Sequence, residues 1–146
     1  MSFEQIFDDS YERVLRTRKD GTDFFGAFYH RFLHDDEKIA QRFANTDMAV
    51  QQSMLKKSFY SLFAFYASGQ ADDAIRHIAE RHNRDHLDIH PEFYDRWLEC
   101  LISSVKLFDD EFSEDVELAW RLVMAPGITY MKFKYDKPCS KPSGGR

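Results

Sequence analysis

Cysteine is scarce in this sequence, since Cys100 and Cys139 are the only two among 146 residues. They lie far apart, one in an apolar helical pattern and the other in a polar tail, which predicts free thiols in a reducing compartment. An excess of basic residues is also missing, because the net charge is −5, and this argues against nucleic acid or an anionic membrane as partner. No segment resembles a signal peptide and none is apolar for long enough to span a bilayer. We therefore expect a cytoplasmic protein.

Several short motifs that mark enzyme classes are missing as well. The chain has no glycine-rich phosphate loop, no Gly-x-Ser-x-Gly turn and no Cys-x-x-Cys pair, which argues against nucleotide hydrolases, α/β-hydrolases and dithiol oxidoreductases. Glu-x-x-His does not occur either, so the carboxylate-bridged di-iron bundle is not indicated. None of these catalytic templates fits the chain.

Aromatic residues are abundant instead, at 16% of the chain with 14 phenylalanines. Side chains of this kind suit a thick helical core or a core that grips a flat apolar ligand. Apolar residues recur at helical spacings almost throughout, and no alternating strand pattern competes with them. The pattern predicts one all-α domain of about seven helices over residues 1–137. Residues 138–146, rich in Pro, Gly, Ser and Lys, are predicted to form a disordered tail.

Capping and helix-breaking residues set the expected boundaries of these helices. Thr22 is the expected N-cap of the aromatic second helix, and Gly69 is expected to end the long fourth helix. Pro126-Gly127 falls inside the last helix and predicts a kink or a split there. The expected helices run through residues 3–14, 24–32, 39–43, 48–66, 72–84, 91–105 and 113–131.

His82 is the first residue that could carry chemistry. It shares the apolar stripe of the fifth predicted helix with Ile75 and Ile78, so its side chain points where apolar side chains point. A lone histidine on such a stripe is more often a hydrogen-bonded core residue than a ligand. Taken alone, His82 therefore predicts no site.

Two other helices supply partners that change this interpretation. Gln51 and Leu55 lie on the inner face of the long fourth helix, and Tyr29 lies on the inner face of the second. Haem iron accepts histidine as one axial ligand and leaves the other position to a diatomic gas. A tyrosine hydroxyl and a glutamine amide can both donate hydrogen bonds to such a ligand. Phe43 and the aromatic second helix would hold the porphyrin by stacking.

Two alternatives compete with a haem site. Aromatic stripes such as the one that contains Tyr29 are usually ordinary core, and without the other features that interpretation would be preferred. His82, His86 and His90 stand at positions i, i+4 and i+8, and on one continuous helix they could chelate zinc or another metal. The residue before Pro91 avoids the α region, so the helix is expected to end earlier. His86 and His90 are therefore interpreted as surface or haem-edge residues.

The order and spacing of several motifs resemble the bacterial single-domain globins, over about residues 3–135. Residues 28–43 resemble the stretch from that family's distal tyrosine to its haem-packing phenylalanine. Gln51-Gln52-Ser53-Met54-Leu55 resembles the Gln-x-x-x-Leu of the distal helix, 31 residues before His82. Ala79-Glu80-Arg81-His82 resembles the end of the proximal helix, and Pro91-Glu92-Phe93-Tyr94 resembles the start of the next helix. Ala119-Trp120 fits the final helix.

The resemblance implies a globin fold around a haem pocket, with haem b as cofactor and His82 as the iron ligand. It also implies a diatomic gas ligand, O₂, NO or CO, and leaves a homodimer open. The residues that it assigns to the cofactor site are His82, Tyr29, Phe43, Gln51, Leu55, Tyr94 and, at the haem edge, His86.

The chain departs from the flavohaemoglobin-type globins on the proximal side. Tyr94 matches their proximal tyrosine, but residues 132–135, where their glutamate falls, include no acid. Because that pair supports the ligand histidine, its loss implies a less anionic imidazole. The loop from His82 to Tyr94 is also slightly longer than theirs. A flavin reductase domain has no room in this chain, so catalytic turnover would need a separate reductase.

Three functions remain open from the sequence. The first is reversible binding of O₂ or NO, for storage, delivery or, with a reductase, NO dioxygenation. The second is a haem-based sensor or interaction module, since a fold does not determine a function. The third is a helical protein that binds a metal through His82, His86 and His90.

Overall fold

Seven α-helices make up the computed structural model, which describes residues 1–137. Six of them begin at a serine or aspartate side chain that accepts a hydrogen bond from a backbone N–H of the first turn. The predicted all-α class is confirmed, and the predicted tail lies outside the described residues. The helices are α1 (Phe3–Leu15), α2 (Phe24–Leu33), α3 (Glu37–Arg42), α4 (Met48–Ser68), α5 (Asp73–His82), α6 (Glu92–Phe108) and α7 (Glu114–Lys134).

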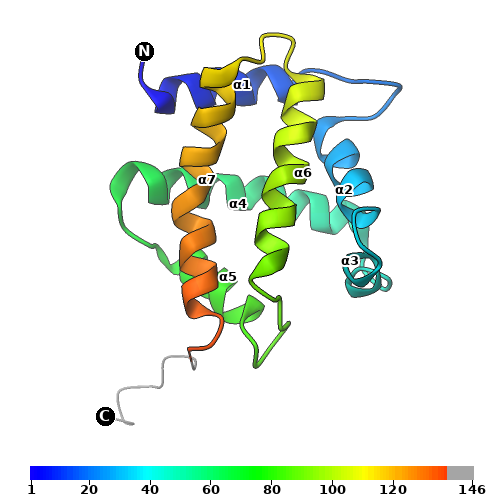
Figure 1. Cartoon of the computed structure of the whole chain (residues 1–146), viewed down its shortest axis with the longest axis vertical. Coiled ribbons are helices and arrows are strands. Elements are labelled where there is room, and N and C mark those ends of the chain that lie inside the picture. Colours follow the sequence, from blue (N-terminus) through cyan, green and yellow to red (C-terminus); the bar gives the residue numbers. More distant parts are fainter. Residues whose placement is uncertain (138–146) are drawn as a thin grey trace.

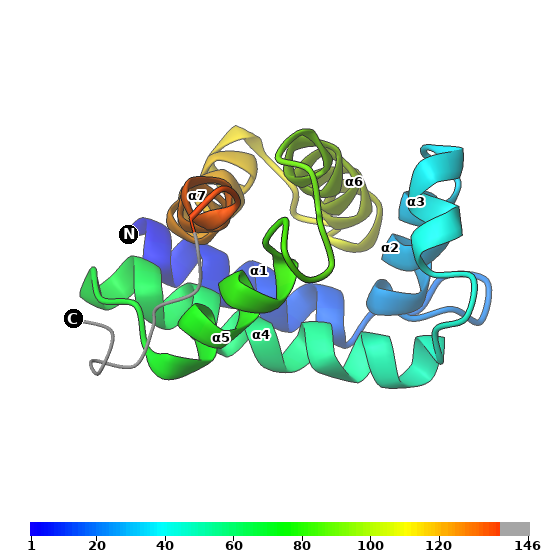
Figure 2. The same ribbon diagram turned by 90° about the horizontal axis from the view of Figure 1, so that it is seen from below.

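The helices cross one another in two levels. α6 and α7 lie side by side, and α1 and α4 cross behind them (Figure 1). Seen from below, α5 lies with α1 and α4 on the level opposite α6 and α7, while α2 and α3 stand at one end (Figure 2). α7 contacts α1, α4, α5 and α6, and α2 packs against α6. Within residues 1–137, no helix is both long and apolar enough to cross a bilayer.

Trp120 is the centre of the core at the end of the molecule away from α5. Its indole is fully buried and its ring lies 4.7 Å from that of Phe7 and about 6 Å from those of Phe24 and Phe59. These rings come from α1, α2 and α4, so one side chain of α7 joins four helices. Many of the phenylalanine rings therefore pack against aromatic rings of other helices where the helices cross.

A buried ionic network ties α1 to the end of α6. The Asp109 carboxylate is completely buried and accepts two bonds from the Arg13 guanidinium, at 2.6 and 2.9 Å. It also accepts from the Ser10 hydroxyl at 2.6 Å and from the Glu111 N–H at 2.9 Å. The Trp120 indole N–H donates to the Ser10 oxygen in turn. Ser10 and Arg13 lie far from Asp109 in the sequence, and Glu111 lies in the loop after α6. Helical periodicity, which relates only residues of one helix, therefore does not predict this network.

Three of the predicted boundaries are wrong. Asp23 is the N-cap of α2, because its carboxylate accepts from the Gly26 N–H at 2.8 Å, whereas Thr22 pairs with Lys19 in a turn. α5 ends at His82, earlier than expected, since Asn83 has an extended conformation. α7 runs without a break through Pro126-Gly127. By contrast, Gly69 ends α4 as predicted, with a φ of +73° that favours glycine.

Candidate functional site

A cavity of about 240 Å³ opens between α2, α3, α4, α5, α6 and α7. Its polar groups come from few residues, and the rest of the wall consists of aliphatic and aromatic side chains. Such a lining excludes water and suits a flat apolar ligand. The apolar residues that line it are Phe32, Ile39, Phe43, Met54, Leu55, Leu62, Ile78, Ile89, Phe93, Trp97, Ile128 and Met131.

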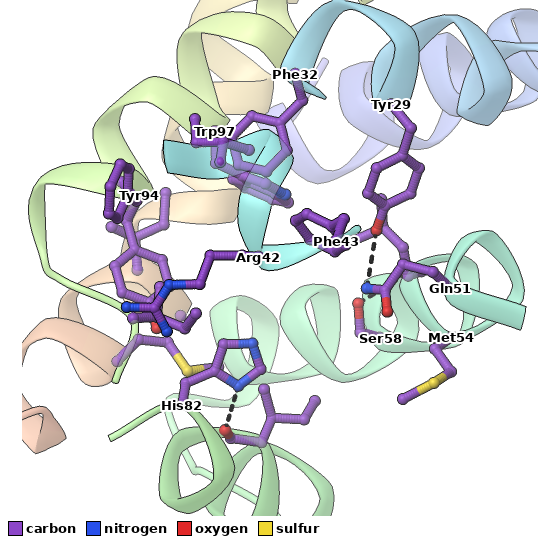
Figure 3. Close-up of a pocket in the computed structure, with 18 of the residues that line it drawn as sticks. Tyr29, Phe32, Arg42, Phe43, Gln51, Met54, Ser58, His82, Tyr94 and Trp97 are labelled. Atoms are coloured by element: carbon purple, nitrogen blue, oxygen red, sulfur yellow. Dashed lines mark hydrogen bonds between the residues drawn. The ribbon is translucent and has the colours of Figure 1, made fainter. Parts of the chain in front are cut away.

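Tyr29 and Gln51 form the polar pair on one side of the cavity. The Gln51 amide nitrogen donates to the Tyr29 hydroxyl oxygen at 3.1 Å, which joins α2 to α4 (Figure 3). Tyr29 is only 4% exposed, and this burial raises the pKa of its hydroxyl to about 12, although the bond from Gln51 opposes the shift. Tyr29 therefore keeps its proton at physiological pH. Since its oxygen accepts from Gln51, the O–H remains available as a donor into the cavity.

His82 reaches the same cavity from the last position of α5. Its Nδ1 lies 2.7 Å from the carbonyl oxygen of Ile78, one turn earlier in the helix (Figure 3). A carbonyl can only accept, so Nδ1 carries the proton and the lone pair is on Nε2. Burial lowers the pKa of the imidazole and the nearby Arg81 lowers it further, although the Ile78 bond acts in the opposite direction. The ring is thus neutral, and its orientation is set by its own helix.

Tyr94 lies beside the imidazole on the wall formed by α6. The two ring centroids are 6.5 Å apart with a tilt of 38°. Burial raises the pKa of the Tyr94 hydroxyl, so it stays protonated. Residues 132–135, where flavohaemoglobin-type globins place a glutamate, supply Lys132 instead. Its ammonium group forms a surface ion pair with Asp95 of α6 at 2.7 Å. The hydrogen bond that orients the His82 ring goes to the Ile78 carbonyl of its own helix.

Comparison with known proteins identifies the family. No family model matches the sequence, and no curated protein matches it. Among solved structures, the chain is similar to protein PA3967 from Pseudomonas aeruginosa PAO1, described as structurally highly homologous to a human haemoglobin. The two are 35% identical with a TM-score of 0.83, over 92% of this chain and 98% of that one. The chain is a bacterial single-domain globin.

This globin brings together six of the seven residues that the sequence assigned to the cofactor site. Phe43 follows the last residue of α3, and Leu55 faces the cavity one turn after Gln51 on α4. His86 is not among the lining residues; it lies in the loop after α5, where its Nδ1 is 2.9 Å from the Asn83 side-chain oxygen. The six that line the cavity are Tyr29, Phe43, Gln51, Leu55, His82 and Tyr94.

The structure contradicts the alternative of a three-histidine metal site. α5 ends at His82, so His86 and His90 lie in the following loop and do not share a helix face with it. Among the described residues, no group of three His, Cys, Asp or Glu side chains lies close enough to hold a metal ion. His90 instead lies 3.4 Å from a carboxylate oxygen of Asp88.

The residues of the cavity fit a haem. The globin fold suggests such a cofactor, and the wall offers one neutral imidazole whose unprotonated nitrogen is the ligand atom that haem iron requires. Aromatic and aliphatic side chains surround it, as a porphyrin plane requires. Sequence reasoning did not assign Arg42, Ser58 or Gly127 to the site, because none of them interrupts the apolar periodicity in a way that indicates a site.

Gly127 accounts for the unusual sequence within α7. It lines the cavity at the point where α7 crosses α4, and a Cβ at this position would overlap Cδ2 of Leu62. Glycine leaves room for the Leu62 methyl group at this crossing, and its φ is an ordinary helical one, so the backbone conformation itself does not call for glycine. Pro126 sits one residue earlier without ending the helix.

Substitution of Gly127 by alanine is expected to lower the free energy of unfolding by up to about 2 kcal/mol. Overpacking against Leu62 costs about 1–3 kcal/mol, and the better helix propensity of alanine offsets about 1 kcal/mol of that. In a Leu62→Ala background the obstacle is gone, so the same substitution should stabilise by about 1 kcal/mol. Urea unfolding of the four proteins measures both values. An equal loss in both backgrounds would show that Leu62 is not the obstacle.

Proposed function

We propose that this globin binds haem b through His82 and reversibly binds a diatomic gas, O₂ or NO, beside Tyr29 and Gln51. One observation carries the proposal: a single apolar cavity receives a neutral imidazole from α5 and a hydrogen-bonding pair from α2 and α4. Haem iron supplies the gas-binding chemistry when it is present. The chain supplies the ligand nitrogen of His82, the hydroxyl of Tyr29 as a hydrogen-bond donor, and an apolar lining that excludes water.

The proposed role of His82 follows from its proton and its orientation. Ligation requires an unprotonated nitrogen, and a histidine with a lowered pKa has one at physiological pH without first losing a proton. The Ile78 carbonyl holds Nδ1–H, so the ring presents Nε2 and cannot readily flip. This arrangement supports His82 as the single protein ligand of the cofactor.

The proposed role of Tyr29 is to donate a hydrogen bond to the gas. Gln51 orients the phenol by donating to its oxygen. A hydroxyl that accepts one hydrogen bond becomes a better donor in the next, because the two bonds polarise each other. The apolar surroundings strengthen this bond because little water competes for the donor. We therefore expect a slow release of O₂.

The decisive experiment is an absorption spectrum of the purified protein in its ferric, ferrous and CO-treated forms. Haem bound through one histidine predicts a Soret band that shifts on reduction and again when CO is added. A pyridine haemochrome assay of the extracted cofactor identifies haem b. A colourless protein that takes up no added haemin would refute the proposal.

Replacement of Tyr29 by phenylalanine is expected to raise the rate of O₂ dissociation about 5- to 30-fold, the loss of a hydrogen bond worth roughly 1–2 kcal/mol. Stopped-flow displacement of O₂ by CO measures the rate. Tyr60→Phe is the matched control, because Tyr60 is 72% exposed on α4. An unchanged rate in the Tyr29 variant would mean that Tyr29 does not contact the gas.

A further inference from the structure

Arg42 occupies an unusual position for a charged residue. It is the last residue of α3 and one of the residues that line the apolar cavity, and its side chain is 41% exposed. Among the lining residues of the described chain, it carries the only guanidinium or ammonium group. Figure 3 shows its side chain extending from α3 toward the side of the cavity that carries Tyr94 and His82. A positive charge thus stands where the cavity meets solvent.

The contacts of Arg42 leave most of its hydrogen-bonding capacity in reserve. Its guanidinium donates to the backbone carbonyls of Leu87 and Asp88, the second at 3.0 Å. These two bonds use two of the five N–H donors that a guanidinium carries, and their acceptors are uncharged. A carboxylate oxygen of Asp88 lies 3.8 Å from Nη2, which is too far for a hydrogen bond.

Asp88 is also engaged elsewhere. One of its carboxylate oxygens accepts the Tyr135 hydroxyl, and the other lies 3.4 Å from Nε2 of His90. Its backbone has a φ of +54°, which non-glycine residues rarely adopt. Such a conformation persists where surrounding contacts hold it. The loop that offers its carbonyls to Arg42 is therefore anchored at the end of α7, and it holds the guanidinium at the mouth of the cavity.

We propose that Arg42 binds a carboxylate of the cofactor and makes the cavity selective for porphyrins whose carboxylates are free. The inference rests on the proposed function, because haem b is a porphyrin with two carboxylate arms. The planar guanidinium fork matches a carboxylate with two parallel hydrogen bonds, and bonds between charged groups are about twice as strong as neutral ones. The N–H donors that the loop carbonyls leave unused can therefore take a carboxylate arm while the loop keeps the guanidinium in place. Asp88 and Tyr135 act as positioning residues.

The test uses iron-free protoporphyrin IX and its dimethyl ester, so that iron ligation does not enter the measurement. Each is titrated into the haem-free protein, and binding is followed by quenching of tryptophan fluorescence, since Trp97 lines the cavity. The wild-type protein is expected to bind the free acid about tenfold or more tightly than the ester. Arg42→Gln should lose about the same factor for the acid and leave ester binding unchanged. Arg42→Lys should fall between them, because an ammonium keeps the charge without the fork.

Arg31→Gln is the matched control, since Arg31 is exposed on α2, does not line the cavity and undergoes the same change of charge. Equal affinities of the wild-type protein for acid and ester would overturn the inference without any variant. A loss that is equal for both porphyrins in Arg42→Gln would also overturn it and make Arg42 a structural tie to the loop. In either case, parallel uptake of haemin would leave the proposed function intact. Failure to take up haemin or either porphyrin would refute both.

Discussion

The His82→Gly variant is expected to lose its haem during purification and to recover a Soret band when imidazole is added. The substitution removes the one cavity nitrogen that is both unprotonated and oriented by its own helix. Changes one step removed from a metal ligand already weaken metal binding about 10- to 100-fold, and loss of the ligand itself should exceed that. Free imidazole fits the space that the side chain leaves and restores the nitrogen. Absorption spectra with and without imidazole measure both effects.

Two other histidines serve as controls for this variant. His77 is exposed on the same helix, so His77→Ala keeps the helix and removes an imidazole away from the cavity. His86 tests the assignment to the haem edge, and its replacement by alanine should leave the spectrum unchanged because it does not line the cavity. A His82→Gly protein that keeps the wild-type spectrum would refute His82 as the ligand.

The largest expected effect on stability comes from a residue far from the cavity. Arg13→Ala is expected to lower the free energy of unfolding by about 3–5 kcal/mol, because it leaves the Asp109 carboxylate buried without its cation. Two bonds from the guanidinium are lost at a side chain that is fully buried. Urea unfolding at neutral pH measures the change. Arg16→Ala, at an exposed position at the end of α1, should change stability by less than about 0.5 kcal/mol.

The double variant Arg13→Met, Asp109→Leu separates the net contribution of the ion pair from the cost of breaking it. Replacing both partners of a buried pair with apolar residues of similar size is often neutral or stabilising. The double variant should therefore be more stable than Arg13→Ala. If the two were equally unstable, the loss would come from packing and the buried charge would not be its cause.

The same network predicts how stability depends on pH. Burial raises the pKa of Asp109, but the bonds from Arg13, Ser10 and the Glu111 N–H outweigh it and hold the pKa below its ordinary value. The stabilisation is therefore complete above the unfolded pKa, about 3.9, and is lost as the pH falls through the lower folded value. Without Arg13 the carboxylate takes up a proton more readily when folded. The difference in stability between wild type and Arg13→Ala should thus be largest at neutral pH and shrink as the pH falls and the variant's buried carboxylate takes up its proton. A difference that stays constant with pH would show that Asp109 is not responsible.

Most of the fold follows from local patterns in the sequence. Apolar spacing and side-chain caps are properties of one helix at a time, so the number of helices and the stripe that carries His82 could be predicted without knowing how the helices pack. The same holds for Gly69, whose positive φ ends α4 whatever surrounds it. The prediction of Thr22 as the N-cap of α2 was wrong because Thr22 and Asp23 are neighbours and both are good capping residues. Thr22 pairs with Lys19 in a turn, which leaves Asp23 as the cap.

The candidate site could be predicted in its parts but not in its connections. Tyr29, Gln51 and His82 were found because each interrupts an apolar stripe with a side chain that can hydrogen-bond or ligate. Arg42 was missed since an arginine at the end of a helix looks ordinary along the chain, and Gly127 was interpreted only as a helix breaker beside Pro126. Their roles depend on neighbours from other helices, Arg42 on the loop before α6 and Gly127 on Leu62.

The sequence by itself determined the all-α class, the helices and the inward direction of His82, Tyr29 and Gln51, because these depend on contacts within a few residues. Only the tertiary structure decided that Gln51 donates to Tyr29, that His82 ends its helix and that His86 lies off the cavity. It alone paired Arg13 with Asp109. The physical reason is that these contacts join groups many residues apart, and the crossing of the helices, which brings them together, is set by side-chain packing between helices.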